Sequence, residues 1–337
     1  MRRNILYVNN RDGTFTNRAK EYGVDDDGYG TCGYFNDLDG DGDLDLFVVN
    51  HPYNFVETDG MHITYNKSRV LVAARDTSLR GESSRYYENI NGKFVDKTYE
   101  AGLRTRSFGL SALLQDFNGD GKTGIYLAND FLEPDYLFVN KGNGKFVNEH
   151  EQHFRHGSYF SMGTDYADLN NDGHSDLIVT DMLPTDNRRR KQLQRPSNYD
   201  VFDKQVRYGF GYQYLKNVVQ INNGNGQYSD LSYFTGMAFS DWSWAVLMND
   251  FDLDGLKDVY IANGMPRDIH DLDYVRFKMD SINKALVKTK NSTDILKLLS
   301  AIPTVKIQKH YYKNYGNLQF RKENKEAGLE QFAWSFG

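Results

Sequence analysis

Short apolar runs recur four times along the chain, and each follows a stretch rich in aspartate and glycine. The first such segment reads DLDGDGDLDLFVVN from Asp37, and related segments begin at Asp116, Asp168 and Asp250. Apolar runs of this length, bounded by turn-forming residues, are typical of buried β-strands. Another strand is expected before each acidic stretch, where an aromatic residue and then a small residue recur (Tyr29 and Cys32, Phe108 and Ser111, Phe160 and Gly163, Trp242 and Ala245). Each acidic stretch is therefore predicted to be a loop between two strands.

Asx-Gly pairs mark a second kind of connection, at Asp12–Gly13, Asn91–Gly92, Asn143–Gly144 and Asn225–Gly226. Such a pair is the strongest local signal for a β-hairpin, because both central residues of a type I′ turn need positive φ. Each hairpin ends in an aromatic residue at a constant distance from the next acidic loop: 15 to 37, 94 to 116, 146 to 168 and 228 to 250, a step of 22 each time. The length variation therefore falls between each acidic segment and the following hairpin.

These segments combine into one unit: strand, acidic loop, strand, insert, strand, Asx-Gly turn, strand. Four-stranded units repeating at this size predict the blades of an all-β propeller. The units are expected at 1–28 (half a blade), 29–106, 107–158, 159–240, 241–331 and 332–337, about four and a half blades within 1–337. Inserts are expected at 51–84, 183–212 and 265–309, with a small helical element near 279–299 in the last. Because both ends fall inside a unit, we expect the chain to be a fragment.

The acidic loops have the composition of calcium sites. A hard cation such as Ca²⁺ takes six to eight oxygen ligands, which Asp or Asn at loop positions 1, 3, 5 and 9 and a backbone carbonyl at position 7 supply. Position 6 is always glycine, as a sharp turn with positive φ requires. The expected ligands, with the carbonyl donor fourth in each loop, are Asp37, Asp39, Asp41, Asp43 and Asp45; Asp116, Asn118, Asp120 and Lys122; Asp168, Asn170, Asp172, His174 and Asp176; and Asp250, Asp252, Asp254, Leu256 and Asp258.

Up to four Ca²⁺ ions are therefore predicted, with a weaker site in the second loop, where position 9 is Gly124. An EF-hand is excluded, because it needs a glutamate at position 12 and flanking helices, whereas position 12 here lies inside a strand. Plain acidic surface turns are the remaining alternative. Several carboxylates in one nine-residue loop would repel one another without a cation, which favours calcium with a structural role.

The acidic loops and the N-x-x-x-G-x-F hairpins resemble FG-GAP (VCBS-type) repeats, as in the integrin α-subunit β-propeller. Stretches at 182–187, 241–244 and 263–268 make the chain more similar to bacterial secreted proteins related to cartilage acidic protein, in which an ASPIC/UnbV-type domain follows the repeats. The resemblance implies that the propeller has seven blades and that the ASPIC/UnbV-type domain lies beyond this sequence. It also implies a location outside the cytoplasm: secreted, periplasmic or at the outer cell surface.

The composition and the motifs of the chain exclude several classes of protein and of partner. The chain has 337 residues, and its single cysteine excludes a disulfide scaffold and a cysteine-based zinc finger. A net charge of −6 argues against a nucleic-acid partner, because a phosphate backbone needs a positive protein surface. Four bound Ca²⁺ ions would change the net charge from −6 to +2. The exclusion of nucleic acid therefore rests on the lack of a recognition motif. No apolar stretch is long enough for a transmembrane segment. The sequence contains no nucleophile elbow, Walker loop or dinucleotide fingerprint, so we nominate no catalytic or cofactor-binding residue.

The unit order divides the connections between two faces. Acidic loops and Asx-Gly turns share one face, and the inserts share the other, where a ligand is expected. The insert at 183–212 has a surplus of basic residues, which predicts either an anion-binding patch or pairing with the protein's own acidic groups. We expect a calcium-binding adhesion or recognition module for a glycan or protein ligand. The alternatives are a polysaccharide-active enzyme on a propeller scaffold and a purely architectural segment.

Overall fold

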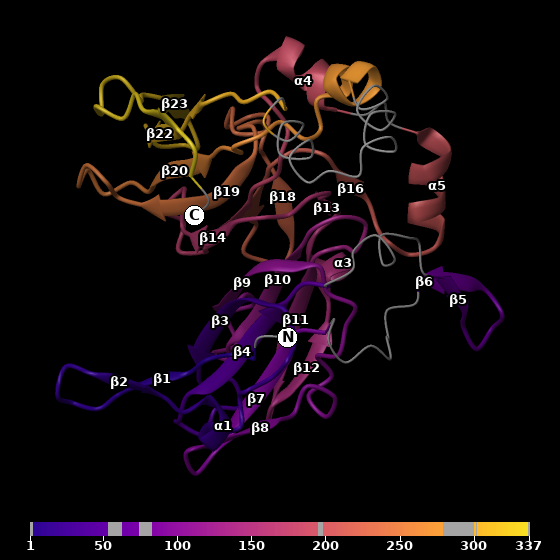
Figure 1. Cartoon of the computed structure of the whole chain (residues 1–337), viewed down its shortest axis with the longest axis vertical. Coiled ribbons are helices and arrows are strands. Elements are labelled where there is room, and N and C mark those ends of the chain that lie inside the picture. The colour runs from indigo at the N-terminus through magenta and orange to yellow at the C-terminus, as the bar shows by residue number, and fades with distance from the viewer. Residues whose placement is uncertain are drawn as a thin grey trace.

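The computed structural model describes residues 3–52, 63–73, 83–194, 198–278, 300 and 302–335. Within these ranges the chain forms four four-stranded antiparallel sheets, each with its strands in the order of the sequence (Figure 1). The sheets are β3 (Gly30–Asn36), β4 (Asp45–Asn50), β7 (Arg85–Ile90) and β8 (Lys93–Asp96); β9 (Gly109–Gln115), β10 (Gly124–Asn129), β11 (Tyr136–Gly142) and β12 (Lys145–Asn148); β14 (Thr164–Ala167), β15 (Asp176–Val179), β17 (Val218–Asn222) and β18 (Tyr228–Asp230); and β19 (Ser243–Asn249), β20 (Asp258–Asn263), β22 (His310–Asn314) and β23 (Phe320–Lys322). The all-β propeller fold and its four-stranded blades are confirmed.

Smaller elements decorate these blades. The two-stranded sheets pair β1 (Tyr7–Asn9) with β2 (Phe15–Asn17), β5 (Ile63–Tyr65) with β6 (Leu71–Ala73), β13 (Gly157–Ser158) with β16 (Gln213–Tyr214), and β21 (Ile307–Gln308) with β24 (Phe332–Ala333). The helices are α1 (Ala19–Tyr22), α3 (His150–His153), α4 (Asn187–Leu193), α5 (Tyr199–Arg207) and the π-helix η1 (Tyr274–Lys278). The helical element expected near 279–299 lies outside the described residues.

The hydrophobic cores lie between neighbouring blades, because alternate residues of a strand point to opposite faces of its sheet. In β10, Ile125 and Leu127 pack with Phe47 and other residues of the first blade. Tyr126 and Ala128, which alternate with them, pack against the third blade. Every residue of β4 and β10 is buried, which explains the continuous apolar runs in these two strands.

The first strands of successive blades lie close together, and the recurring small residue falls at this approach. Ser111 Oγ donates a hydrogen bond to Met162 O of the next blade, at 2.5 Å. A Cβ atom on Gly163 would lie 2.6 Å from Trp244 O and 2.7 Å from Ala245 Cα. Side chains larger than these would therefore push two blades apart.

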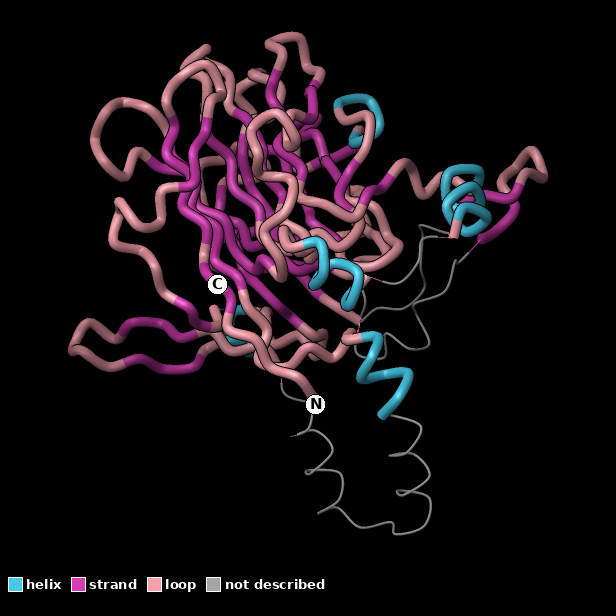
Figure 2. The backbone as a smooth tube through the Cα atoms, turned by 90° about the horizontal axis from the view of Figure 1, so that it is seen from above, coloured by secondary structure: helices cyan, strands magenta, loops and turns pink. Residues whose placement is uncertain are grey.

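The type I′ turn is confirmed at two of the four Asx-Gly pairs. Asn91 and Gly92 have φ values of 56° and 77°, and Asn143 and Gly144 have 51° and 61°, as a type I′ turn requires. At Asp12–Gly13 and Asn225–Gly226 only the glycine has positive φ, 85° and 78°, so the predicted type I′ geometry is wrong there, although both pairs still lie in turns between paired strands. The inserts are larger additions to the blades. In Figure 2 the β5–β6 hairpin of the first insert lies beside α5 of the second insert. A backbone hydrogen bond from Ala73 N to Tyr208 O, 2.5 Å long, joins these two inserts.

Candidate functional site

All four acidic loops are wound in the same way around the carboxylate at position 1. That carboxylate accepts a hydrogen bond from the glycine N–H at position 6: Gly42 to Asp37 at 3.1 Å, Gly121 to Asp116 at 2.8 Å, Gly173 to Asp168 at 2.8 Å and Gly255 to Asp250 at 2.9 Å. These glycines have φ between 81° and 97°. The carboxylate at position 5 accepts from the N–H at position 7 (Asp41 from Asp43, Asp120 from Lys122, Asp172 from His174, Asp254 from Leu256). The positive φ expected at position 6 is confirmed.

The first loop gathers its carboxylates most closely. Oxygens of Asp37, Asp39 and Asp45 lie within 4.8 Å of one another. Burial, reinforced by the neighbouring carboxylates, raises the pKa of Asp39. Asp43 Oδ1 is buried and has no hydrogen-bond partner among the described residues, which also form no ion pair with this loop. Clustered hard oxygens without a compensating charge fit a divalent cation such as Ca²⁺.

Position 9 has a structural role that the sequence did not reveal. Asp45, Asp176 and Asp258 are almost completely buried. Each accepts a 2.8 Å hydrogen bond from a backbone N–H of the third strand (Asn89, Asn222 and Asn314, respectively). Burial raises the pKa of Asp176 to about 6. These buried carboxylates therefore tie the acidic loop to the third strand of its own blade.

The second and fourth loops already have a lysine beside their carboxylates. Lys122 Nζ lies 3.3 Å from Asp120 Oδ2 in the second loop. In the fourth loop Asp250, Asp252 and Asp254 are as closely grouped as the carboxylates of the first. Lys313 contacts Asp252 and lies 3.3 Å from Asp254 Oδ2, and its ammonium group lowers the pKa of Asp252. An ammonium group at this position would compete with a metal ion.

In the second and third loops, the described residues include no group of three carboxylates as close as those of the first. In the second loop a Cβ on Gly124 would lie 2.9 Å from Phe138 O, so the position-9 side chain is excluded by packing. In the third, Asn170 Nδ2 donates to Asp172 Oδ2 at 2.9 Å. The first loop is thus the best preserved of the four candidate sites.

Acidic loops and hairpin turns lie on one face. A Cβ on Gly144, in the turn of the second blade, would lie 3.6 Å from Asp39 Cβ in the first. Asn171 Nδ2, in the third acidic loop, donates to Gly255 O of the fourth at 3.1 Å. The inserts leave the strands from their opposite ends.

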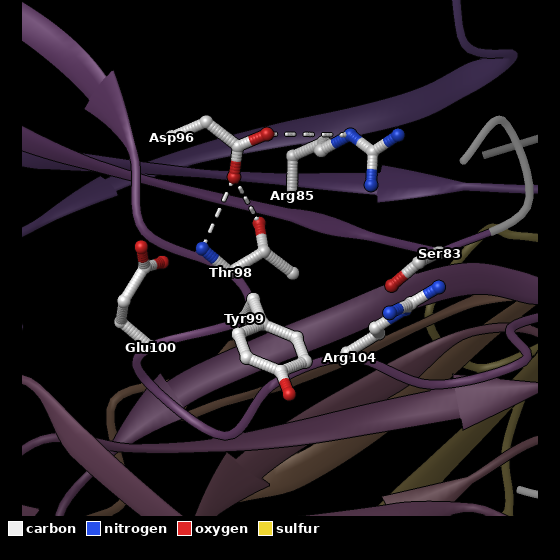
Figure 3. A pocket seen from close by; sticks show the side chains of 7 residues that line it. All are labelled: Ser83, Arg85, Asp96, Thr98, Tyr99, Glu100 and Arg104. Atoms are coloured by element: carbon white, nitrogen blue, oxygen red, sulfur yellow. Dashed lines mark hydrogen bonds and ion pairs between the residues drawn. The ribbon is translucent and has the colours of Figure 1, made fainter. Parts of the chain in front are cut away.

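The insert-bearing face contains a pocket of about 370 Å³ at the edge of the first blade (Figure 3). Its lining comes from the start of β7, the end of β8 and the connection to the second blade (Ser83, Arg85, Asp96, Thr98, Tyr99, Glu100 and Arg104). The pocket therefore lies away from the acidic loops, which occupy the other ends of these strands. None of these residues belongs to a recurring motif, so the pocket could not be predicted from the sequence.

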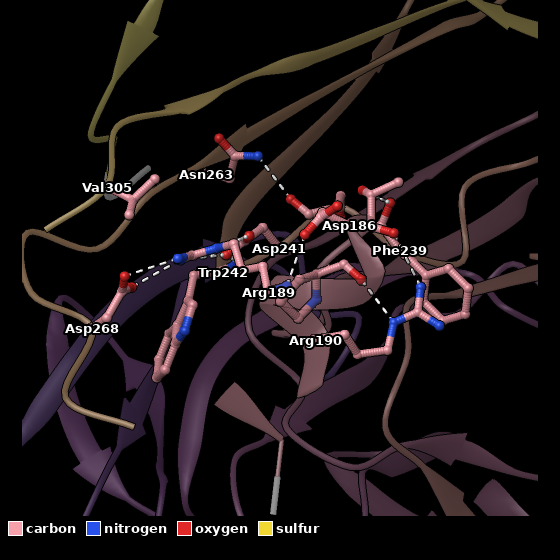
Figure 4. A network of polar contacts seen from close by, with 12 residues as sticks. Asp186, Arg189, Arg190, Phe239, Asp241, Trp242, Asn263, Asp268 and Val305 are labelled. Atoms are coloured by element: carbon pink, nitrogen blue, oxygen red, sulfur yellow. Dashed lines mark hydrogen bonds and ion pairs between the residues drawn. The ribbon is translucent and has the colours of Figure 1, made fainter. Parts of the chain in front are cut away.

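The arginines of the second insert are used largely within the protein. Arg189 Nε lies 2.6 Å from Asp241 Oδ2, and its two terminal nitrogens lie 2.8 Å from the carboxylate of Asp268 (Figure 4). These carboxylates raise the pKa of Arg189. Arg190 stacks over the ring of Phe239 at 4.1 Å and donates to Pro184 O. Arg189 and Arg190 therefore pair with the protein's own groups, as one of the two sequence interpretations predicts, whereas Arg188 is exposed.

Two comparisons with known proteins give matches. The family model of the FG-GAP-like repeat matches residues 2–48 and 116–179, so these two parts of the chain are similar to FG-GAP-like repeats. No curated protein matches the chain. A solved structure that concerns specific recognition of non-reducing terminal N-acetylglucosamine by an Agrocybe aegerita lectin is 14% identical, covering 98% of this chain and 75% of that one, with a TM-score of 0.33. In the described ranges, no helix has the length and apolar character needed to cross a membrane.

Proposed function

We propose that this chain is a calcium-stabilised propeller that acts as a binding module for a glycan or protein ligand outside the cytoplasm. The observation that carries the proposal is the first acidic loop, where three carboxylates meet within 4.8 Å and no ion pair among the described residues offsets their charge. Asp37, Asp39, Asp41, the Asp43 carbonyl and Asp45 would hold the ion. The other three loops, with Lys122 and Lys313 beside two of them, would bind it more weakly.

Calcium would supply the positive charge that these carboxylates need. The chain itself does the rest: the glycine at position 6 turns the loop around Asp37, and the buried Asp45 connects it to Asn89 in the third strand. Stiffening this loop fixes the first two strands relative to the third. The inserts at the opposite strand ends would thereby be presented in one arrangement. Exposed sites of this kind bind Ca²⁺ weakly, which suits the high calcium concentrations found outside cells.

The test of the metal sites is thermal unfolding with and without calcium. When the free Ca²⁺ concentration is one hundred times the Kd of a site, binding stabilises the folded state by about 2.7 kcal/mol. We expect the melting temperature to rise on adding millimolar Ca²⁺ and to fall with EDTA. Asp39→Ala should lose more of this shift than Asp252→Ala, and Asp27→Ala, at an exposed aspartate outside the loops, should keep all of it. A melting curve indifferent to both calcium and EDTA would refute the proposal.

The ligand is tested separately, on a glycan array with and without a chelator. Calcium-dependent binding without bond cleavage is the expected result. Appearance of cleaved products would identify an enzyme instead. Binding to no glycan and to no protein from the same environment would leave only an architectural role.

A further inference from the structure

The pocket at the edge of the first blade is lined by a buried guanidinium group, that of Arg85, with one nitrogen that lacks a hydrogen-bond acceptor among the described residues. The Arg85 side chain is only 6% exposed. Its Nε lies 3.4 Å from Asp26 Oδ2 and 3.9 Å from Asp96 Oδ2. Its Nη2 is buried without a hydrogen-bond partner among the described residues. A buried donor without an acceptor is destabilising, so an acceptor placed in the pocket would be bound favourably.

The neighbouring carboxylates are held in place by other donors. Asp96 Oδ1 accepts from the backbone N–H of Thr98 at 3.0 Å and from its hydroxyl at 2.6 Å. Asp26 Oδ1 accepts from Gly28 N at 2.6 Å. Neither carboxylate is free to turn onto Arg85 Nη2 without losing these bonds. The missing acceptor must therefore come from elsewhere.

The other residues that line the pocket indicate which kind of ligand would supply that acceptor. Tyr99 is 70% exposed, and the Arg104 guanidinium lies 5.8 Å from the centre of its ring. In Figure 3 the two arginines and Ser83 lie on one side of the pocket, and Glu100 lies on the other. Two arginines favour a carboxylate, which pairs with a guanidinium through two parallel hydrogen bonds. An exposed aromatic ring offers an apolar surface with low conformational entropy cost, and Glu100 accepts hydrogen bonds from hydroxyl groups.

We propose that this pocket binds a carboxylate-bearing sugar, the uronic acid residue of an acidic glycan. The sugar carboxylate pairs with Arg85 on the arginine side, the ring packs on Tyr99, and ring hydroxyls donate to Glu100. A volume of about 370 Å³ leaves room for a sugar ring and not only for a carboxylate. This assignment rests on the proposed function in one respect, because it names the ligand of the proposed binding module.

The matched probes are glucuronate and glucose, which differ by a carboxylate in place of a hydroxymethyl group. We expect titration calorimetry to detect glucuronate binding that weakens with added salt, and glucose to bind at least about tenfold more weakly. Arg104→Ala and Tyr99→Ala should each weaken glucuronate binding about fivefold or more. Arg188→Ala, which removes an exposed arginine outside the pocket, should leave it unchanged. Arg85→Lys keeps the charge but loses the planar pair of donors, and should also weaken binding.

Equal affinity for glucose and glucuronate would overturn the assignment, as would no glucuronate binding by the folded protein. Acetate that competes as strongly as glucuronate would reduce the pocket to a simple carboxylate site and overturn its sugar specificity. If Arg85→Lys lowers the melting temperature, the exposed Tyr99 and the Arg104 variant still decide the question.

The two proposals fail in different ways. Calcium-dependent binding of neutral glycans that Arg104→Ala retains would remove the pocket assignment and keep the binding module. Glucuronate binding in the pocket, without a calcium response and without recognition of any polymer, would keep the pocket and remove the module.

Discussion

Asp135 is a buried carboxyl group whose ionisation should make the protein less stable as the pH rises. It lies just before β11 and is almost completely buried. Its Oδ2 accepts hydrogen bonds from Tyr126 Oη at 2.6 Å and Ser161 Oγ at 2.8 Å, and its Oδ1 accepts from Asn129 N at 2.8 Å. These bonds favour the ionised form, but burial outweighs them, and with the nearby charge of Asp181 it raises the pKa of Asp135 to about 7.

The size and sign of the effect follow from linkage. The pKa of the unfolded aspartate is 3.8, so between about pH 4 and pH 7 the folded protein keeps a proton that the unfolded chain has released. Stability therefore falls as the pH rises through this window, by up to 1.4 kcal/mol per pH unit. About three units give a loss of about 4 kcal/mol, complete above pH 7 and absent below pH 4.

Asp135→Asn removes the charge and keeps the shape. The hydroxyl groups of Tyr126 and Ser161 are able to accept from the new amide, because a hydroxyl both donates and accepts. We expect the variant to be about as stable as the wild type at pH 4 and more stable by a few kcal/mol at pH 8. Urea denaturation at saturating calcium, repeated from pH 4 to pH 8, measures the difference. Parallel stability curves for the two proteins would refute the reasoning.

Three further changes test other contacts. Gly163→Ala places a Cβ 2.6 Å from a carbonyl oxygen and should cost about 1–3 kcal/mol in urea denaturation, whereas at Gly33 the nearest atom is 3.7 Å away and the same change should be nearly neutral. Lys313→Met removes a competing ammonium group, so calcium titration should give a several-fold higher affinity at the fourth loop; an unchanged affinity would contradict this. Arg189→Ala leaves two buried carboxylates unpaired and should cost about 3–5 kcal/mol, while the exposed Arg188→Ala should change the free energy of unfolding by less than about 0.5 kcal/mol.

The strand order and the loop geometry could be predicted because they depend on neighbours in the sequence. A glycine at position 6, such as Gly42, lies five residues from the carboxylate that its N–H binds. The constant spacing of 22 residues is likewise a short separation along the chain, from a hairpin to the next acidic loop. The small residues at Ser111 and Gly163 were recognised as recurring, although only the packing of neighbouring blades explains them.

The rest depends on contacts between distant parts of the chain. Lys313 reaches Asp252 across 61 residues, and Arg189 reaches Asp268 across 79. The charge of each residue is plain from the sequence, but its partner is decided by how blades and inserts lie in space. The same holds for Arg85, whose unused nitrogen follows from the way Asp26 and Asp96 are held by their own donors.

The alternation along β10 has a consequence for how such chains lengthen or shorten. Each apolar core is shared by two blades, with Ile125 and Leu127 on one side of the strand and Tyr126 and Ala128 on the other. A cut between two blades therefore divides a core, exposing half of it on each piece, and a cut within an insert separates the second strand of a blade from its third. Blades joined in this way unfold cooperatively with their neighbours. A duplicated blade preserves the fold only when each of its two faces fits the blade beside it. The two sides of one strand must therefore evolve against different neighbouring blades.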